Sequence, residues 1–147
     1  MNIIFLDIDG VLVSSNHLLT NGRNREEFDP QCVLYLNELL QKTEAKIVIS
    51  SNWRRIYSLH ELRYLFQKNN VLDRIIGVTP FFNLTTMRGD EIQAYLTHSK
   101  DKISNFVIFD DEENMLNLSD HYIQTHFQVG IQKKDIEQAF QFFTSKF

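Results

Sequence analysis

The sequence predicts an α/β domain built on a mainly parallel, doubly wound sheet. Short apolar stretches alternate along the chain with helical patterns, as is typical of parallel strands joined by crossover helices. Two apolar stretches end in pairs of acids, Asp7 with Asp9 and Asp110 with Asp111. Because ligands of open α/β sheets bind at the carboxyl ends of the strands, these acids also predict where the functional site lies.

The composition sets limits on organisation and partners. The chain has 147 residues, enough for one domain with a sizeable core, and we expect a single domain over residues 1–147. Fifteen basic against nineteen acidic residues, a formal net charge of -4, argue against a broad non-specific grip on nucleic acid. A single cysteine, Cys32, excludes an intramolecular disulfide, and it lies in an apolar helical pattern that favours a core position.

No targeting or membrane segment is evident. The N-terminus lacks a basic n-region and its apolar run is broken by Asp7 and Asp9, and no apolar run reaches the length of about 18 residues that a membrane span needs. We therefore expect a cytoplasmic protein that has no membrane partner and needs no obligatory protein partner.

The first half of the chain predicts two strands and a helix. A strand is expected over Asn2 to Leu6, followed by a polar segment at about 14–28 that forms a loop or flap and is too short for a large cap domain. Asp29 and Pro30 form a helix start, as N-cap and first helical residue, and that helix ends near Thr43. The second strand covers Lys46 to Ser50.

The middle of the chain continues the alternation. Ser58 and Glu61 form a capping box, and the helix after them carries an apolar stripe. A third strand is expected over Arg74 to Thr79, then an irregular connection, then a helix from Arg88 to around His98. The remaining expected elements are a strand at 105–109, a short helix through 115–118, a strand at 122–125 and a terminal helix marked by Ile136, Phe140 and Phe143.

Asp7 and Asp9 are the most informative residues. Side chains at i and i+2 of an extended chain share one face unless the strand is already bending, and Gly10 allows such a bend. Two carboxylates side by side repel each other, so they imply either a bound cation or a raised pKa. A calcium loop is disfavoured because apolar residues follow where further oxygen ligands are needed.

The predicted topology gathers polar residues at one edge of the sheet, in one crevice: Asp7, Asp9, Ser50 or Ser51, Arg88, Asp110 and Asp111. Several carboxylates favour a hard, oxygen-liking cation, and Mg²⁺ is the usual choice beside phosphate. The histidines show no zinc-ligand spacing. These residues supply the parts of phosphoryl transfer: Asp7 as nucleophile, Asp9 as general acid and base, Asp110 or Asp111 as metal ligands, and a serine with Arg88 as phosphoryl clamp.

The same residues resemble the haloacid dehalogenase (HAD) superfamily of phosphohydrolases. The stretch Asp7-Ile8-Asp9-Gly10-Val11-Leu12 resembles its first motif, the serine that ends Lys46 to Ser51 its second, and Asp110-Asp111 its fourth. Three further stretches, Ile47 to Arg54, Gly77 to Pro80 and Arg88 to Ile92, are similar to the small HAD domain of "Swiss Army Knife" RNA-repair proteins. This resemblance covers roughly residues 1 to 115.

The resemblance implies a Rossmann-like HAD core without a large cap and a Mg²⁺-dependent phosphatase. It implies a covalent aspartyl-phosphate on Asp7 and a role for Asp9 as general acid and base. The presence of this second acid favours a phosphatase over a dehalogenase. The predicted phosphate-binding residues are Ser50, Ser51, Asn52 and Arg88, and the predicted metal ligands are Asp7, Asp9, Asp110 and Asp111.

The chain departs from the family pattern at two places. Arg88 stands where the third motif usually has a lysine, and it is a different donor for phosphate. Either Ser50 or Ser51 could be the phosphate-binding hydroxyl, and strand alternation favours Ser51.

For several neighbouring side chains a structural role is an alternative to a role in the site. Arg54 is either a solvated arginine or a substrate contact, and Trp53 is expected to pack. Glu112 and Glu113 are expected to begin a helix, while Asn114 is close enough in sequence to reach the metal shell.

Other functions fit parts of the pattern. A phosphotransferase shares every motif, and a phosphate-binding or partner-binding module can retain the fold without turnover. A signalling receiver domain also phosphorylates an Asp, but its acceptor follows a central third strand, and none follows Arg74 to Thr79 here. We expect a phosphorylated substrate, and the sequence does not decide among a small molecule, a nucleic-acid end and a phosphoprotein.

Overall fold

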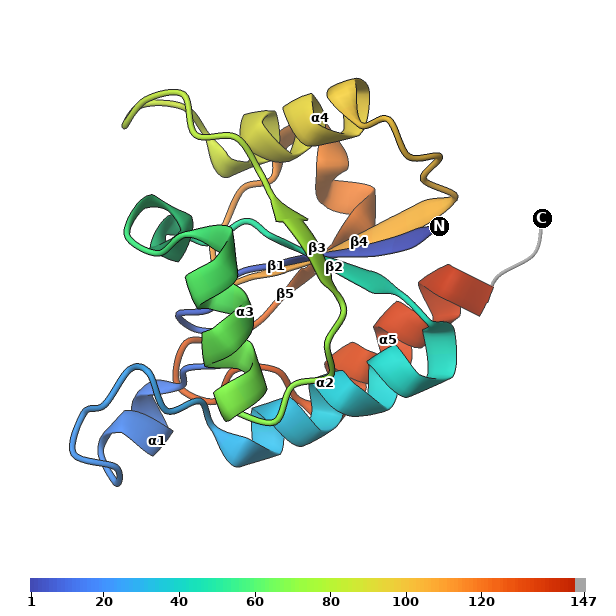
Figure 1. Ribbon diagram of the computed structural model, residues 1–147. Coiled ribbons are helices and arrows are strands. Elements are labelled where there is room, and N and C mark those ends of the chain that lie inside the picture. The colour runs from blue at the N-terminus through green and yellow to red at the C-terminus, as the bar shows by residue number, and fades with distance from the viewer. Residues whose placement is uncertain (145–147) are drawn as a thin grey trace.

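The structure, a computed structural model, describes residues 1–144 and has a five-stranded parallel sheet at its centre (Figure 1). The strand order is β3-β2-β1-β4-β5. All pairs of neighbouring strands are parallel. The strands are β1 (Asn2–Leu6), β2 (Lys46–Ile49), β3 (Ile75–Val78), β4 (Asn105–Asp110) and β5 (Tyr122–Gln124). The predicted α/β fold with a parallel, doubly wound sheet is confirmed.

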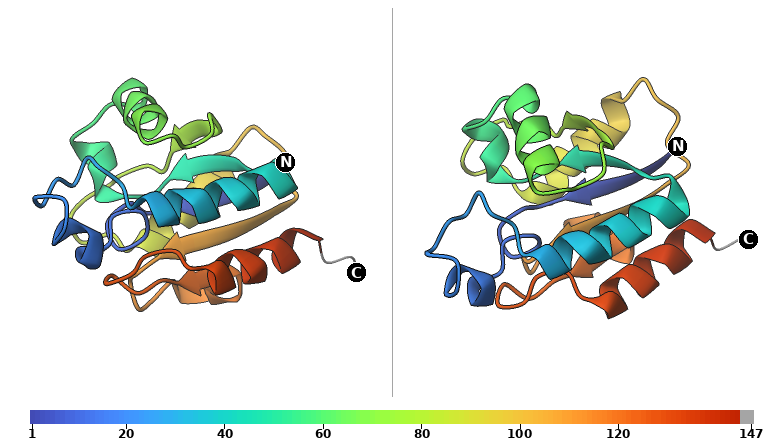
Figure 2. Two further views of the ribbon diagram at one scale, coloured as in Figure 1. Left: turned by 90° about the horizontal axis from the view of Figure 1, so that it is seen from below. Right: turned by 60° about the horizontal axis from the view of Figure 1, so that its bottom comes forward.

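Helices cover both faces of the sheet. The α-helices are α1 (Ser15–Leu18), α2 (Pro30–Thr43), α3 (Leu59–Lys68), α4 (Arg88–His98) and α5 (Lys133–Thr144), and the 3-10 helices are η1 (Asn52–Arg55) and η2 (Leu116–His121). Helices α2 and α5 lie side by side below the sheet, while α4 lies above it (Figures 1 and 2). After β3 the chain returns across the sheet and adds β4 on the other side of β1. Connections that run in opposite directions across a parallel sheet lie on opposite faces, which explains why helices cover both.

Some of the predicted element boundaries differ from the observed ones by one to three residues. The strands β2 and β3 end at Ile49 and Val78, one residue earlier than expected, because Ser50 and Thr79 donate a last ladder bond and then turn away. The predicted short helix is the 3-10 helix η2, which begins at Leu116. Glu112 and Glu113 therefore lie in the loop before it and do not begin a helix, contrary to the sequence-based expectation.

The predicted helix starts are confirmed by their hydrogen bonds. The Asp29 side chain accepts the Gln31 N–H at the start of α2, with Pro30 in the first turn. The Ser58 hydroxyl accepts the Glu61 N–H, and the Glu61 carboxylate accepts the Ser58 N–H, which completes a capping box at α3. Both caps satisfy N–H groups that have no partner inside the helix.

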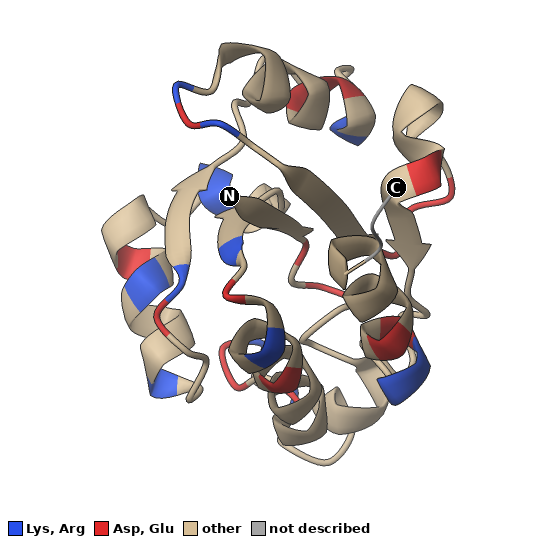
Figure 3. Ribbon diagram, turned by 90° about the vertical axis from the view of Figure 1, so that its right-hand side faces the viewer, with Lys and Arg blue, Asp and Glu red and all other residues tan. Residues whose placement is uncertain are grey.

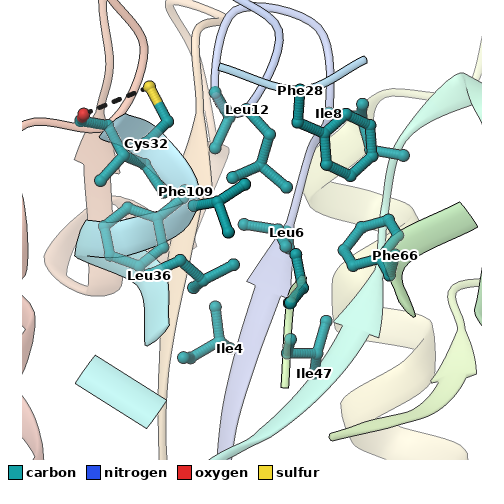
Figure 4. Close-up of a cluster of buried hydrophobic side chains, with 14 of the residues drawn as sticks. Ile4, Leu6, Ile8, Leu12, Phe28, Cys32, Leu36, Ile47, Phe66 and Phe109 are labelled. Atoms are coloured by element: carbon teal, nitrogen blue, oxygen red, sulfur yellow. Dashed lines mark hydrogen bonds between the residues drawn. The ribbon is translucent and has the colours of Figure 1, made fainter. Parts of the chain in front are cut away.

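Alternate residues of β1 pack into two different cores. Ile4 and Leu6 belong to the larger cluster, shared with α2, α3 and α5, and part of it appears in Figure 4. Ile3 and Phe5 belong to the smaller cluster, which includes Ile92 of α4. Because the side chains of a strand alternate between faces, the strand residues that continue Ile3 and Phe5 point toward α4.

Cys32 is fully buried in the larger core, as the sequence predicts, and its thiol faces the backbone carbonyls of Val129 and Ile131 (Figure 4). Burial, together with nearby Asp29, raises the pKa of the thiol to about 12. We therefore expect the native protein to resist thiol reagents at pH 8, because the thiolate is the reactive form. Labelling with a disulfide reagent with and without denaturant checks this. Rapid labelling of the native protein contradicts it.

The segment between β1 and α2 contains no large cap. Within residues 7–29 the structure has only the four-residue helix α1 and turns, which matches the predicted loop or flap at 14–28. Phe28 at its end is buried against Phe66, so this part of the segment is anchored to the core. Among residues 1–144, no helix has both the length and the apolar character that crossing a membrane requires.

Candidate active site

The candidate site lies between β1 and β4, where the order in which the chain adds strands to the sheet reverses. From β1 the chain proceeds to β2 and β3 on one side, and β4 and β5 lie on the other side of β1. Adjacent strands that lead away in opposite directions leave a crevice at their carboxyl ends. In Figure 1 these ends lie to the left, and the N-terminus and the end of α5 lie to the right. Asp7 and Asp110 stand on either side of this crevice, after β1 and at the end of β4.

Three carboxylates meet at this point. Asp7, Asp110 and Asp111 each offer an oxygen, and these oxygens all lie within 4.8 Å of one another. Backbone amides hold two of the groups: the Ile8 N–H donates to Asp7 Oδ1 at 2.8 Å, and the Asp111 and Glu112 N–H groups donate to Asp110 Oδ1 at 2.8 and 3.0 Å. The predicted meeting of the two acidic strand ends is therefore present in the structure.

Arg88, the first residue of α4, provides positive charge beside this cluster. Its Nη1 lies 2.5 Å from Asp110 Oδ2 and 3.4 Å from Asp7 Oδ2, and its Nη2 lies 3.5 Å from Glu112 Oε1. The side chain is buried. A buried arginine needs paired acids, and here two of its partners are the buried members of the carboxylate cluster.

The cluster carries more negative charge than Arg88 compensates. Burial and the neighbouring Asp110 raise the pKa of Asp7 well above its usual value, and the same two causes raise the pKa of Asp111. This is one of the two outcomes that crowded acids predict. The oxygen ligands and the excess negative charge fit a hard divalent cation such as Mg²⁺, which Asp7, Asp110 and Asp111 would hold.

Asp9 lies apart from the three clustered carboxylates. Its Oδ1 is 2.9 Å from Nη1 of Arg25, and its Oδ2 accepts the Trp53 indole N–H at 2.9 Å. The chain turns immediately after β1, with the N–H groups of Val11 and Leu12 bonded to the Ile8 carbonyl. Asp9 is not among the carboxylates whose oxygens lie within 4.8 Å of one another, and its predicted roles as metal ligand and as acid and base stay predictions.

Gly10 makes the turn possible and has no room for a side chain. Its φ is +78°, a conformation that L-residues rarely adopt, and a Cβ would lie 2.3 Å from Asp111 Oδ2. The bend that Gly10 was expected to allow is present. It also lets the backbone of the first motif approach the carboxylate of the fourth motif closely.

The register places Ser50 beside Asp7. Leu6 pairs with Ile49, so the next residues, Asp7 and Ser50, stand level and point to the same side of the sheet, toward α4. Within residues 1–144 the buried Ser50 hydroxyl has no hydrogen-bond partner, whereas the Ser51 hydroxyl accepts the Trp53 N–H. This arrangement favours Ser50 over Ser51, the reverse of the sequence-based preference, because the strand ends one residue earlier than predicted.

The other predicted site residues occupy the margin of the crevice. Asn52 begins η1 and lines a cavity of about 200 Å³ together with Arg88 and Glu112. Asn114 is exposed, and its side chain caps the Leu116 N–H. The structure thus gives Asn114 a local turn role.

Arg54 is not solvated. Its side chain is 2 % exposed and its Nη2 lies 2.8 Å from Glu91 Oε1 of α4. Burial lowers the pKa of Arg54, and Glu91 opposes that shift. The solvated alternative is therefore wrong, because four residues beyond Ser50 the side chain lies inside the protein. A substrate contact of Arg54 stays a prediction.

Sequence reasoning missed three contributors to the site. Trp53 packs, as expected, between Phe28 and Tyr57, but its indole N–H also holds Asp9. Arg25 reaches Asp9 from the flap, and Glu91 pairs with Arg54 inside the protein. The pattern of charged and apolar residues along the sequence does not predict such pairs, because the two residues of each pair are far apart in the sequence.

Lys and Arg residues alternate with Asp and Glu residues along the ribbon on the side of the molecule drawn in Figure 3. At the end of the molecule that carries the N-terminus and the end of α5, Lys and Arg are mixed with Asp and Glu on the visible helices and loops (Figure 3). This mixture agrees with the modest net charge of -4. The concentrated charge is at the opposite end, in the carboxylate cluster.

Comparison with known proteins agrees with this site. The sequence model of the HAD domain in Swiss Army Knife RNA repair proteins matches residues 3–136, which include all three clustered carboxylates and Arg88. Searches of curated proteins and of solved structures gave no match. The matched region covers all five strands and every predicted site residue. The chain therefore belongs to the family of HAD domains found in Swiss Army Knife RNA repair proteins.

Proposed function

We propose that this HAD domain is a Mg²⁺-dependent phosphomonoester hydrolase. Membership of the HAD superfamily supports a hydrolase or phosphotransferase of this type. The observation that carries the finer proposal is the group of Asp7, Asp110 and Asp111 with Arg88 at the switch point of the sheet. It combines a nucleophile, oxygen ligands for a cation and a donor for phosphate oxygens in one buried place.

In the proposed reaction, a carboxylate oxygen of Asp7 attacks phosphorus and the bond from phosphorus to the leaving oxygen breaks. Asp9 gives its proton to that oxygen. Water then attacks the phosphorus of the aspartyl-phosphate while Asp9 takes a proton from it, which releases inorganic phosphate and restores Asp7. Mg²⁺, when bound, would offset the negative charge that otherwise repels the attacking carboxylate.

The separation of Asp9 from the cluster supports this division of labour. Asp9 is outside the three clustered carboxylates, so the proposed cation does not hold its carboxyl group. Both of its oxygens accept hydrogen bonds, which favour the ionised form, so the contact with Arg25 must open before Asp9 carries a proton. The ion pair with Arg25 is exposed and comes from the flap, so it can open at little cost when a substrate enters. Ser50 and Arg88 are the proposed donors to the phosphoryl oxygens.

A substrate panel tests the proposed function directly. Hydrolysis of an aryl phosphate, short phosphorylated oligonucleotides, sugar phosphates and phosphopeptides is measured with Mg²⁺ and again with excess chelator. We expect phosphate release from at least one class with Mg²⁺ only. Phosphoryl transfer to an added alcohol without net release indicates a phosphotransferase, and binding of phosphate without turnover indicates a non-catalytic module.

Substituting Trp53 tests how Asp9 is held. Trp53→Phe keeps a ring in the core but removes the N–H that donates to Asp9. We expect kcat to fall about tenfold while Mg²⁺ affinity stays unchanged, because general acid and base catalysis typically contributes about 10²–10⁴-fold and only orientation is lost. Tyr57→Phe, which removes a hydroxyl bonded to Glu26, is the control. Equal kinetics of both variants contradict the role of Trp53.

A further inference from the structure

Arg54 uses its whole guanidinium group inside the protein. Its Nε donates to the Thr79 carbonyl at 3.0 Å, and its Nη1 donates to the Ser50 and Ser51 carbonyls at 2.9 and 2.8 Å. Its Nη2 donates to the Pro80 carbonyl at 3.3 Å and lies 2.8 Å from Glu91 Oε1. A guanidinium has five N–H donors, so each one has a partner and none is left for a ligand.

These partners come from three separate segments that surround the crevice. Ser50 and Ser51 follow β2, Thr79 and Pro80 follow β3, and Glu91 lies in α4, three residues after Arg88. Residues three apart on a helix lie on the same face, so Glu91 fixes the part of α4 that presents Arg88. Arg54 therefore ties the segment of the proposed phosphate-binding serine to the helix of the proposed phosphate-binding arginine.

The bonds of Arg54 go to backbone carbonyls and leave the nearby hydroxyl unused. Within residues 1–144 the Ser50 hydroxyl is buried and has no hydrogen-bond partner. An unpaired buried hydroxyl costs free energy, so it needs a reason such as an incoming ligand. Arg54 holds the Ser50 backbone while its hydroxyl stays available for a ligand.

We propose that Arg54 and Glu91 are positioning residues that hold Ser50 and Arg88 at the separation that a phosphoryl group requires. The proposal rests on the proposed function for its kinetic consequences, but its structural content can be tested without turnover. Buried ion pairs add little net stability compared with apolar residues of similar volume, so stability alone does not explain this pair. A planar group with five donors joins several carbonyls at once, which no apolar residue does.

The test is the double variant Arg54→Met/Glu91→Leu, which removes both charges together. We expect a folded protein with a lower Tm, because the carbonyls that Arg54 holds lose their donor. In that folded protein, KM for an aryl phosphate and the inhibition constant of inorganic phosphate should both rise about tenfold or more, since small misplacements of binding groups are costly. The value of kcat should change less than about threefold, because contacts to the phosphoryl oxygens exist before and during the reaction. The parent's KM and phosphate inhibition constant in the folded double variant overturn the proposal.

Two further variants serve as control and safeguard. The exposed pair Glu38–Lys42 of α2 has its charges 3.0 Å apart and lies away from the crevice, so Glu38→Leu/Lys42→Met should leave KM unchanged. If the double variant at Arg54 does not fold, the variant Arg54→Lys tests the proposal instead. Lysine keeps the positive charge beside Glu91 but has only three N–H donors, so this variant should have a higher KM than the parent in a folded protein. A folded Arg54→Lys protein with the parent's KM overturns the proposal.

Amide hydrogen exchange followed by NMR separates this proposal from the proposed function. In the double variant the amides of Ser50, Ser51 and Asn52 should exchange at least about tenfold faster, while those of β4 keep the parent's rates. A parent that neither hydrolyses nor binds phosphate rejects the proposed function, and the exchange at 50–52 then still decides whether Arg54 positions this segment. Unchanged exchange there rejects the positioning role.

Discussion

Asp7→Asn is expected to abolish hydrolysis, with a loss of at least about 10⁴-fold in kcat, as is common when a nucleophile is removed. An amide cannot form the aspartyl-phosphate, and it is a poorer ligand for a hard cation than a carboxylate. Steady-state hydrolysis of the best substrate in the panel checks this. The exposed acid Asp120, which lies in η2, provides the control Asp120→Asn with the same loss of charge.

The same substitution has an opposite effect on stability. The pKa of Asp7 is raised in the folded protein, so the ionised group opposes folding, and stability falls as the pH rises from its unfolded pKa toward its folded one. Without a divalent cation, Asp7→Asn should therefore have a higher Tm than the parent at pH 7. Mg²⁺ should raise the Tm of the parent more than that of the variant, because binding to the folded state stabilises it.

These measurements decide the role of Asp7 together. An inactive variant with a raised Tm in chelator supports a nucleophile placed in a repulsive cluster. An active Asp7→Asn protein rejects the proposed chemistry. An inactive protein with a lowered Tm instead means that Asp7 is needed for the fold, because in that case its contacts with Ile8 and Arg88 outweigh the repulsion.

Gly130→Ala is expected to have the largest effect on stability, about 3 kcal/mol or more, from left-handed backbone strain added to overpacking. Gly130 has φ of +68°, and a Cβ there would lie 2.4 Å from the Val11 carbonyl oxygen and 2.9 Å from Cys32 Sγ. The Val11 carbonyl accepts the Ile131 N–H, so the backbone of the loop that follows β1 must move. Chemical denaturation measures the change.

Gly22 supplies the matched control. Its φ is +73°, close to that of Gly130, but a Cβ there meets nothing within 4 Å. Gly22→Ala should therefore cost only the backbone strain, about 1 kcal/mol. The difference in the free energy of unfolding between the two variants gives the cost of the clash with the Val11 carbonyl and Cys32. Equal losses in both show that the loop yields without cost.

Some features are readable from the sequence because they depend on neighbouring residues. The strand over Asn2–Leu6 and the helix start at Asp29 and Pro30 have the predicted bounds, since apolar runs and helix caps are local signals. The alternation of strands and helices predicts the parallel sheet, and a parallel sheet brings all carboxyl ends to one edge. That topology alone predicts that Asp7 meets Asp110.

The tertiary structure alone decided which side chains do the finer work. Asp9, predicted to lie with Asp7, is instead held by Arg25 and Trp53, because the chain turns one residue after Asp7. Arg54 gave no sequence signal for its role, since its partners lie up to 37 residues away, at Glu91. The alternation of strands and helices along the chain determines that the carboxyl ends of the strands share one edge of the sheet. Side-chain direction after those ends depends on turns and packing, to which residues distant in sequence contribute.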